Sequence, residues 1–261
     1  MASIKPPTPQ QLFNLNKWLA VFFAVQAIAI LLFSNVHLVP ITTSYLTRDP
    51  LASIAAGQGM AATATNHLFD VNLTIVVSVF MLIAAVGFAL AATVYRKRYE
   101  ADLKQKTNRL RWVEYAVSNS VMLVAVGTVV GVTNIGLLIA IAGCAVVTNL
   151  LGWALERYGK TDATAHLLYG IGAIAGFIPW IILGSFIWGT LALGSGIDIF
   201  VYIVFIVALI LSTILALLVY FQYRRKSQLK DYLQVERMHI GLAAITKTAV
   251  AWLLFAGMLR P

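Results

Sequence analysis

A lysine lies at the centre of the last apolar run of the chain, where an ionised side chain would be far from water. The run extends from Met238 to Gly257, and Lys247 is the tenth of its twenty residues. A helix of about twenty residues crosses a bilayer, so Lys247 is too far from either end to reach the surface. An ammonium at that depth costs about 2.5–3.5 kcal/mol. The position predicts a functional amine that forms an ion pair, binds a substrate or condenses with an aldehyde. A structural pair or a wet crevice is the alternative.

A buried ammonium needs a counter-charge, and Glu114 is the one carboxylate that we place inside an apolar run. The other acidic residues near the runs are at run ends or in loops: Asp70, Glu156, Asp162, Asp198, Asp231 and Glu236. Ser118 follows Glu114 by one helical turn, with Asn119 beside it, and both can hydrogen-bond a carboxylate or a Schiff base. The alternative for Glu114 is a salt bridge with Arg109 or Arg111.

Seven apolar runs of membrane-spanning length account for most of the chain. We expect them at 18–39, 71–94, 112–131, 134–155, 166–193, 199–221 and 238–257. The predicted fold class is therefore an all-α integral membrane protein, one seven-helix domain over residues 1–261. The single cysteine, Cys144, allows no intrachain disulfide, and no metal site is indicated.

The positions of the basic residues predict the orientation. A seven-span threading puts sixteen of the nineteen Lys and Arg residues on one side, counting Lys5, Lys17, seven residues over 96–111, Arg157, Lys160 and five over 224–237. Arg48 and Arg260 fall on the other side. Since cytoplasmic loops carry the Lys and Arg excess, the N-terminus is predicted in the cytoplasm of a multi-pass cell-membrane protein. The net charge of +9 is thus mainly a topology signal, with contact to anionic lipid as the alternative, and nucleic acid binding is not expected.

Two loops carry further expectations. In the outer loop, Ile41 to Leu46 is rich in β-branched residues between Pro40 and an Asp49-Pro50 turn, which favours a short strand or hairpin. The charged loop over 95–111 is expected to extend the second and third helices. The four histidines are expected at span ends, in interfacial positions: His37, His67, His166 and His239.

Several segments, in order along nearly the whole chain, resemble the heliorhodopsin family. They are PITTSYL in the outer loop, RWVEYAVSNSVM entering the third span, GVTNIGLLIAIAG and GWALE in the fourth, PWI at 179–181, FQY…KDYLQVER after the sixth, and the lysine of the last span. The predicted topology, with the N-terminus in the cytoplasm and the C-terminus outside, is inverted relative to ordinary microbial rhodopsins and agrees with that resemblance.

The resemblance implies that Lys247 carries retinal, all-trans in the dark, as a protonated Schiff base with Glu114 as counterion. Trp180 and Met122 are then candidates for the wall along the polyene, with ordinary packing as the alternative for each, whereas Trp252 is expected to pack or face lipid. We also expect membrane lipid contacts, a homodimer, a cytoplasmic signalling partner and no enzymatic activity.

The chain departs from the family pattern around the lysine. A histidine is expected three residues before Gln26, where Phe23 stands, and a second near Gly87 or Phe88. A serine is expected one turn before the lysine, at Ala243. These changes alter the polar pocket proposed to receive the Schiff-base proton.

Transport and sensing need different residues. Pumping rhodopsins carry further carboxylates at the positions of Ala243 and Ala125. Without them, a net proton route would have to run through water and hydroxyl groups alone. We therefore predict a light sensor, with a light-gated ion channel or transporter as the alternative. Outside photochemistry, a transporter in which Lys247 binds an anion and a structural membrane protein both remain.

Overall fold

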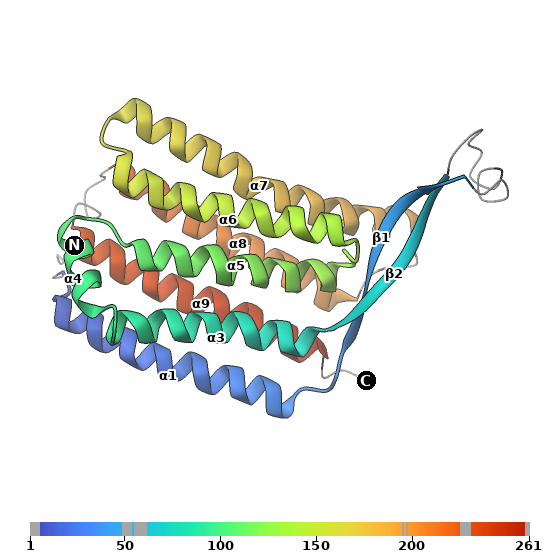
Figure 1. The fold of residues 1–261 in the computed structure, drawn as a ribbon, viewed down its shortest axis with the longest axis horizontal. Helices are drawn as coiled ribbons and strands as arrows, with labels where there is room; N and C mark the ends of the chain where they lie inside the picture. Colours follow the sequence, from blue (N-terminus) through green and yellow to red (C-terminus); the bar gives the residue numbers. More distant parts are fainter. Residues whose placement is uncertain are drawn as a thin grey trace.

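The computed structural model describes residues 6–48, 54, 62–194, 196, 198–224 and 231–258. Within this part of the chain there are eight helices and two strands (Figure 1). The helices are α1 (Pro9–Phe33), α3 (Leu73–Ala92), α4 (Arg96–Lys104), α5 (Arg109–Val130), α6 (Ile135–Tyr158), α7 (Asp162–Leu193), α8 (Ile199–Tyr223) and α9 (Tyr232–Met258). All except α4 are long and apolar enough to span a membrane, which confirms the predicted seven-helix fold.

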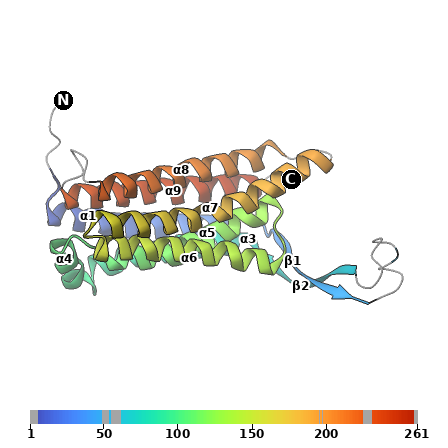
Figure 2. The ribbon, with the colours of Figure 1, turned by 90° about the horizontal axis from the view of Figure 1, so that it is seen from above.

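The seven long helices lie side by side in one bundle. Successive helices from α1 through α3, α5 and α6 to α7 are neighbours, and α9 packs against α1, α3, α5 and α8. Helix α4 caps one end, and the two strands project from the other (Figures 1 and 2). We call these the α4 end and the hairpin end. Helix α1 begins at the α4 end and α9 finishes at the hairpin end, as an odd number of crossings requires.

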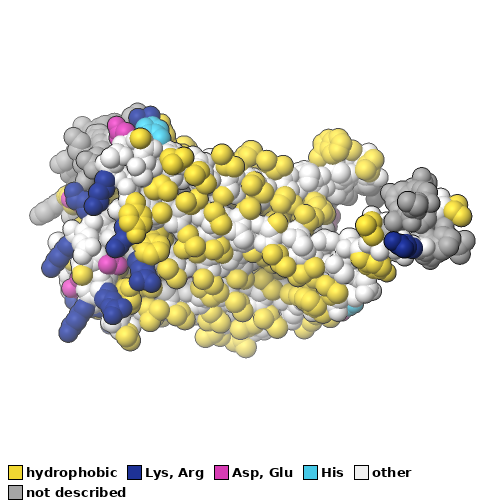
Figure 3. Space-filling model, turned by 45° about the horizontal axis from the view of Figure 1, so that its top comes forward, with side chains coloured by type: hydrophobic (Ala, Val, Ile, Leu, Met, Phe, Trp, Pro, Cys, Tyr) yellow, Lys and Arg dark blue, Asp and Glu magenta, His cyan; other side chains and the backbone are white. Residues whose placement is uncertain are grey.

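The sides of the bundle are apolar, as expected for contact with lipid. Large side chains such as Phe22, Leu32 and Ile174 are exposed on them. Figure 3 shows hydrophobic side chains along the length of the bundle and Lys and Arg side chains gathered at the α4 end. Exposed apolar area of this extent indicates a membrane surface.

Several predicted span boundaries differ from the structure. The largest difference is at the start of α1, which begins at Pro9 instead of 18, with Thr8 as its N-cap. Helix α1 ends at Phe33 instead of 39, because Leu38 already belongs to a strand. The second strand continues through Val71 to Asn72, whose side chain accepts a hydrogen bond from the Thr74 amide at 3.0 Å and caps α3. Helix α9 begins at Tyr232, six residues before the predicted start, because polar residues of its first turns lie inside the protein and not in a loop.

The predicted hairpin is confirmed and is longer than expected. Strand β1 (Leu38–Thr47) pairs antiparallel with β2 (Ala62–Asn72), with an irregularity in register between Ile41 and Thr42. The Thr42 amide donates to the Thr133 carbonyl at 3.0 Å, which ties the base of the hairpin to the turn between α5 and α6.

The segment over 95–111 extends the third helix by Arg109–Arg111 only and does not extend the second, which differs from the expectation that it lengthens both. It forms the separate helix α4, after which Lys106 adopts a positive φ of 57° and turns the chain back. The Asn108 side chain then accepts a hydrogen bond from the Arg111 amide at 3.0 Å and starts α5. This turn places the first residues of α5 beside α4 and the end of α6.

Candidate functional site

The site is centred on an ion pair inside the bundle. Nζ of Lys247, on α9, lies 2.5 Å from Oε1 of Glu114, on α5. Lys247 is 1% exposed and Glu114 is 9% exposed. The Lys247 nitrogen also lies 4.9 Å from the ring centroid of Tyr115, so an aromatic face completes its surroundings. The two charges lie in a low-dielectric interior, where each strongly stabilises the other.

The backbone of α3 closes in on Glu114 at Gly87. A Cβ atom built at Gly87 would overlap Cγ of Glu114. Only a glycine lets α3 approach the carboxylate this closely. Gly87 therefore helps to fix the carboxylate in position.

The alternative pairing of Glu114 with an arginine is not observed. Arg111 forms ion pairs with Glu156 and Glu236, and the three side chains are buried together at the α4 end. We call these three residues the Arg111 cluster. Trp112 Nε1 donates to Glu156 at 2.7 Å and Asn108 Nδ2 donates to Glu236 at 2.7 Å, which stabilises both carboxylates.

Two predictions about polar positions were therefore wrong. Glu156 and Glu236 were assigned to run ends or loops, but α6 and α9 extend past the apolar runs and carry both residues into the protein interior. His239 was assigned to an interface, yet it is fully buried, with Nε2 3.0 Å from Oε1 of Gln222. Apolar windows end at the first charges, whereas helices continue wherever those charges find partners.

A cavity of about 370 Å³ lies beside Lys247. Its walls come from α5, α6, α7, α8 and α9 and are mainly apolar and aromatic. The predicted pocket residues Asn119, Met122 and Trp180 line it together with Lys247. Ser118 does not line it. It is fully buried, and its hydroxyl has no hydrogen-bond partner among the described residues.

Sequence reasoning missed several residues of the cavity wall. These are Trp112, Tyr115, Asn149, Tyr169, Phe177 and Thr246. Trp112, Tyr115, Asn119 and Met122 follow one another at helical spacing, so the α5 wall could have been extended from Glu114 and Met122. The walls from α6 and α7 depend on how the helices pack, which no local pattern shows.

The departures from the expected polar pocket appear as apolar contacts. The rings of Phe23, on α1, and Phe88, on α3, stack with centroids 5.5 Å apart. Ala243 packs in a cluster with Trp112 and Tyr115. Nearby, Trp252 Nε1 donates to Oε1 of Gln26 at 2.7 Å, so this tryptophan packs between α9 and α1.

Fold and site together define a class: a seven-helix membrane protein in which a buried amine, paired with a carboxylate, lines an apolar cavity. Comparison with protein families specifies it further. The heliorhodopsin family model matches residues 12–259, and the chain belongs to this family. It is therefore a retinal-binding rhodopsin and a multi-pass membrane protein. A search of curated proteins found no match.

The residues present fit retinal. A cavity of about 370 Å³ is within the range of about 300–1,000 Å³ that holds small organic ligands. It joins a reactive amine to an apolar, aromatic wall, as an apolar aldehyde requires. The Thr246 hydroxyl, which lines the cavity without a hydrogen-bond partner among the described residues, marks the polar end near Lys247.

Proposed function

We propose that this protein is a light sensor in which Lys247 holds retinal through a Schiff-base linkage and Glu114 is the counterion. The observation that carries the proposal is the 2.5 Å contact between Lys247 and Glu114 at the edge of an apolar cavity. When bound, retinal supplies the absorption of visible light and a light-driven change of shape.

The protein's own groups then have distinct tasks. Glu114 stabilises the positive charge on the Lys247 nitrogen, and the buried site keeps water from weakening that interaction. Trp180 and Met122 shape the wall along which an elongated ligand lies. Helix α9 contacts α1, α3, α5 and α8, so strain at Lys247 reaches most of the bundle and can shift a two-state equilibrium.

Sensing without pumping is supported by the absence, at two positions of this chain, of the carboxylates that a proton relay needs. Ala125 and Ala243 stand where pumps carry carboxylates, and both are buried in apolar surroundings. The Phe23–Phe88 stack occupies the α1–α3 contact with two rings that carry no exchangeable proton.

A light-gated proton channel is the second candidate, and the Arg111 cluster is the observation that favours it. Its carboxylates, with Gln222 and His239, form a buried polar network toward the α4 end. A channel needs a polar path and not an ordered series of acids. The same cluster also explains why the channel is only the second candidate. The Arg111 guanidinium, held between two carboxylates, is a fixed positive charge that opposes proton passage along this path.

We also propose that the α4 end faces the cytoplasm, because the basic side chains gather there (Figure 3). The signalling partner proposed for the sensor then meets the loops of that end. A homodimer in the membrane is part of the same proposal.

Addition of all-trans retinal to membranes that contain the protein tests the assignment. We expect a visible absorption band that Lys247→Ala abolishes. Lys17→Ala, which removes an exposed lysine of α1, should leave the band intact. Folded protein without any band would rule the proposal out.

Light-induced currents and pH changes in cells separate the two modes of action. The sensor predicts neither signal at expression levels that give a clear absorption band. A sustained photocurrent would contradict the sensor and support the channel.

A further inference from the structure

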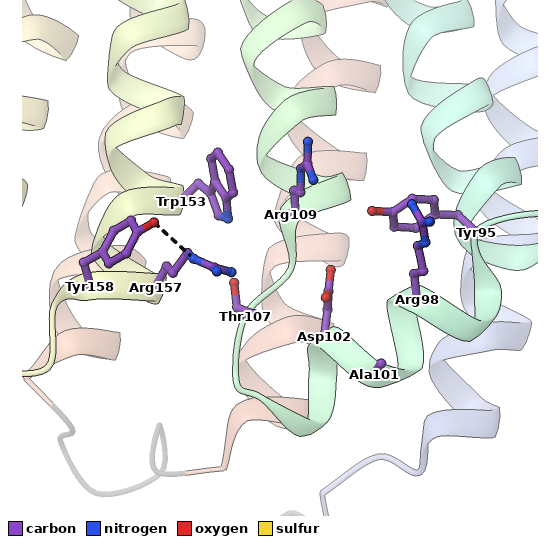
Figure 4. Close-up of a pocket in the computed structure, with 9 residues that line it drawn as sticks. All are labelled: Tyr95, Arg98, Ala101, Asp102, Thr107, Arg109, Trp153, Arg157 and Tyr158. Atoms are coloured by element: carbon purple, nitrogen blue, oxygen red, sulfur yellow. Dashed lines mark hydrogen bonds between the residues drawn. The ribbon is translucent and has the colours of Figure 1, made fainter.

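A second cavity, of about 460 Å³, lies at the α4 end and shares no lining residue with the retinal cavity. Figure 4 shows its lining side chains, which come from α4, the turns before and after it, α5 and α6. Each of the three helices contributes one arginine: Arg98 from α4, Arg109 from α5 and Arg157 from α6.

The cavity has a surplus of positive charge. Its one carboxylate is Asp102, against three guanidinium groups. Among the described residues, none of the three arginines forms an ion pair with a carboxylate. The pocket therefore favours an added negative charge.

A buried hydroxyl points to the same ligand chemistry. Thr107 is 6% exposed and lines the cavity, and its Oγ1 has no hydrogen-bond partner among the described residues. In Figure 4 it lies between Arg157 and Asp102. A buried donor without a partner is costly, and rotation of this side chain toward the cavity would let the hydroxyl donate to an anionic oxygen there.

We propose that this cavity binds a phosphate-bearing ligand through Arg98, Arg109, Arg157 and Thr107. Guanidinium groups match the geometry of phosphate oxygens with paired, charge-assisted hydrogen bonds. The cavity is larger than an inorganic phosphate needs, and Tyr95 and Trp153 provide ring surfaces for an organic part. A soluble phosphomonoester and the headgroup of an anionic phospholipid share this chemistry.

The cavity is connected to the light-sensitive site through aromatic packing. Arg109 lies over the ring of Trp153, 5.4 Å from its centroid, and Trp153 packs against the cluster of Trp112 and Tyr115. Tyr115 in turn lies beside Lys247. Ligand occupancy is therefore expected to regulate the photoreceptor, and this part of the inference rests on the proposed function.

Binding can be measured in the dark and without retinal, so its failure is distinct from failure of the photoreceptor assignment. Calorimetry of the full chain in neutral-lipid nanodiscs, titrated with glycerol 3-phosphate and with inorganic phosphate, tests the soluble source. Native mass spectrometry of protein from nanodiscs that contain phosphatidylglycerol tests the lipid source. Binding in either arm supports the site, and absence from both overturns it.

Two neighbouring residues on α4 provide a matched pair of variants. Arg98→Gln is expected to weaken binding about tenfold or more, the loss of a hydrogen bond to a charged group. Lys97→Gln removes the same charge from an exposed side chain outside the cavity and is expected to have little effect. Equal effects would show general attraction to a basic surface and overturn the site.

Asp102→Asn gives a test with the opposite sign. Loss of the pocket's one carboxylate should tighten phosphate binding several-fold if the ligand is an anion. Weaker binding in a variant that unfolds at the temperature of the parent protein would contradict the proposal.

Discussion

Glu114 has one oxygen on the amine of Lys247, and its Cγ packs against the backbone of Gly87. Its charge is expected to set the colour of the retinal-bound protein. Glu114→Gln should shift the absorption band to longer wavelength, because loss of the counter-charge stabilises the displaced positive charge of the excited state. Spectra of the reconstituted variant check this, with Glu100→Gln, a surface change on α4, as the control. An unshifted band would place the counterion elsewhere.

Gly87 is a second residue at which a small change is expected to have a large effect, here on the stability of the fold. Gly87→Ala would force a methyl group into the Glu114 side chain, and overpacking of a filled interior costs about 1–3 kcal/mol. The variant should unfold at a lower temperature than the parent protein. Gly143→Ala, on α6, meets nothing within 4 Å and is the matched control. Equal melting temperatures for the two variants would show that α3 can move away from Glu114.

At the scale of elements, the Arg111 cluster joins α5, α6 and α9. Arg111→Gln would leave two buried carboxylates without their cation, a loss of about 3–5 kcal/mol in buried ion pairs. Arg109→Gln, which removes an exposed guanidinium two residues away, should cost much less. Denaturant unfolding in detergent compares the two. Similar losses would mean that the cluster contributes little to the contact between these helices.

The sequence predicts most of the helices and fewer of their ends. Hydropathy locates seven spans because lipid requires long apolar helices. It does not show that residues 34–39 leave the helix, since the apolar Val36, Leu38 and Val39 suit a strand equally. Nor does it show that Glu236 is inside, because its burial depends on Arg111, Asn108 and Tyr99, which are more than a hundred residues away.

The predicted pairing of Lys247 with Glu114 follows from the apolar runs, in which these two residues are the only cation and the only carboxylate that we expected in the membrane interior. The cavity wall from α6 and α7 and the arginine pocket at the α4 end follow from no such count. Arg98 and Arg109 are eleven residues apart and Arg157 is 48 residues further on. They share a site because the turn at Lys106 brings α4 beside α5, and α6 packs against α5.

At the scale of the whole molecule, orientation in the membrane is testable with single cysteines. In a Cys144→Ser background, Lys104→Cys at the α4 end should react with an impermeant thiol reagent only from the cytoplasmic side. Thr63→Cys, in the hairpin, should react only from outside, since both side chains are exposed. Labelling of intact and opened cells measures this. The reverse pattern would contradict the cytoplasmic assignment of the α4 end.

The odd number of crossings has a practical consequence for any tethered domain. A reporter joined ahead of α1 and one joined behind α9 would be separated by the bilayer and sample different solutions, ion concentrations and redox conditions. A C-terminal fusion would therefore not report ligand binding at the arginine pocket, whereas an N-terminal fusion would lie at the same end of the bundle as that pocket.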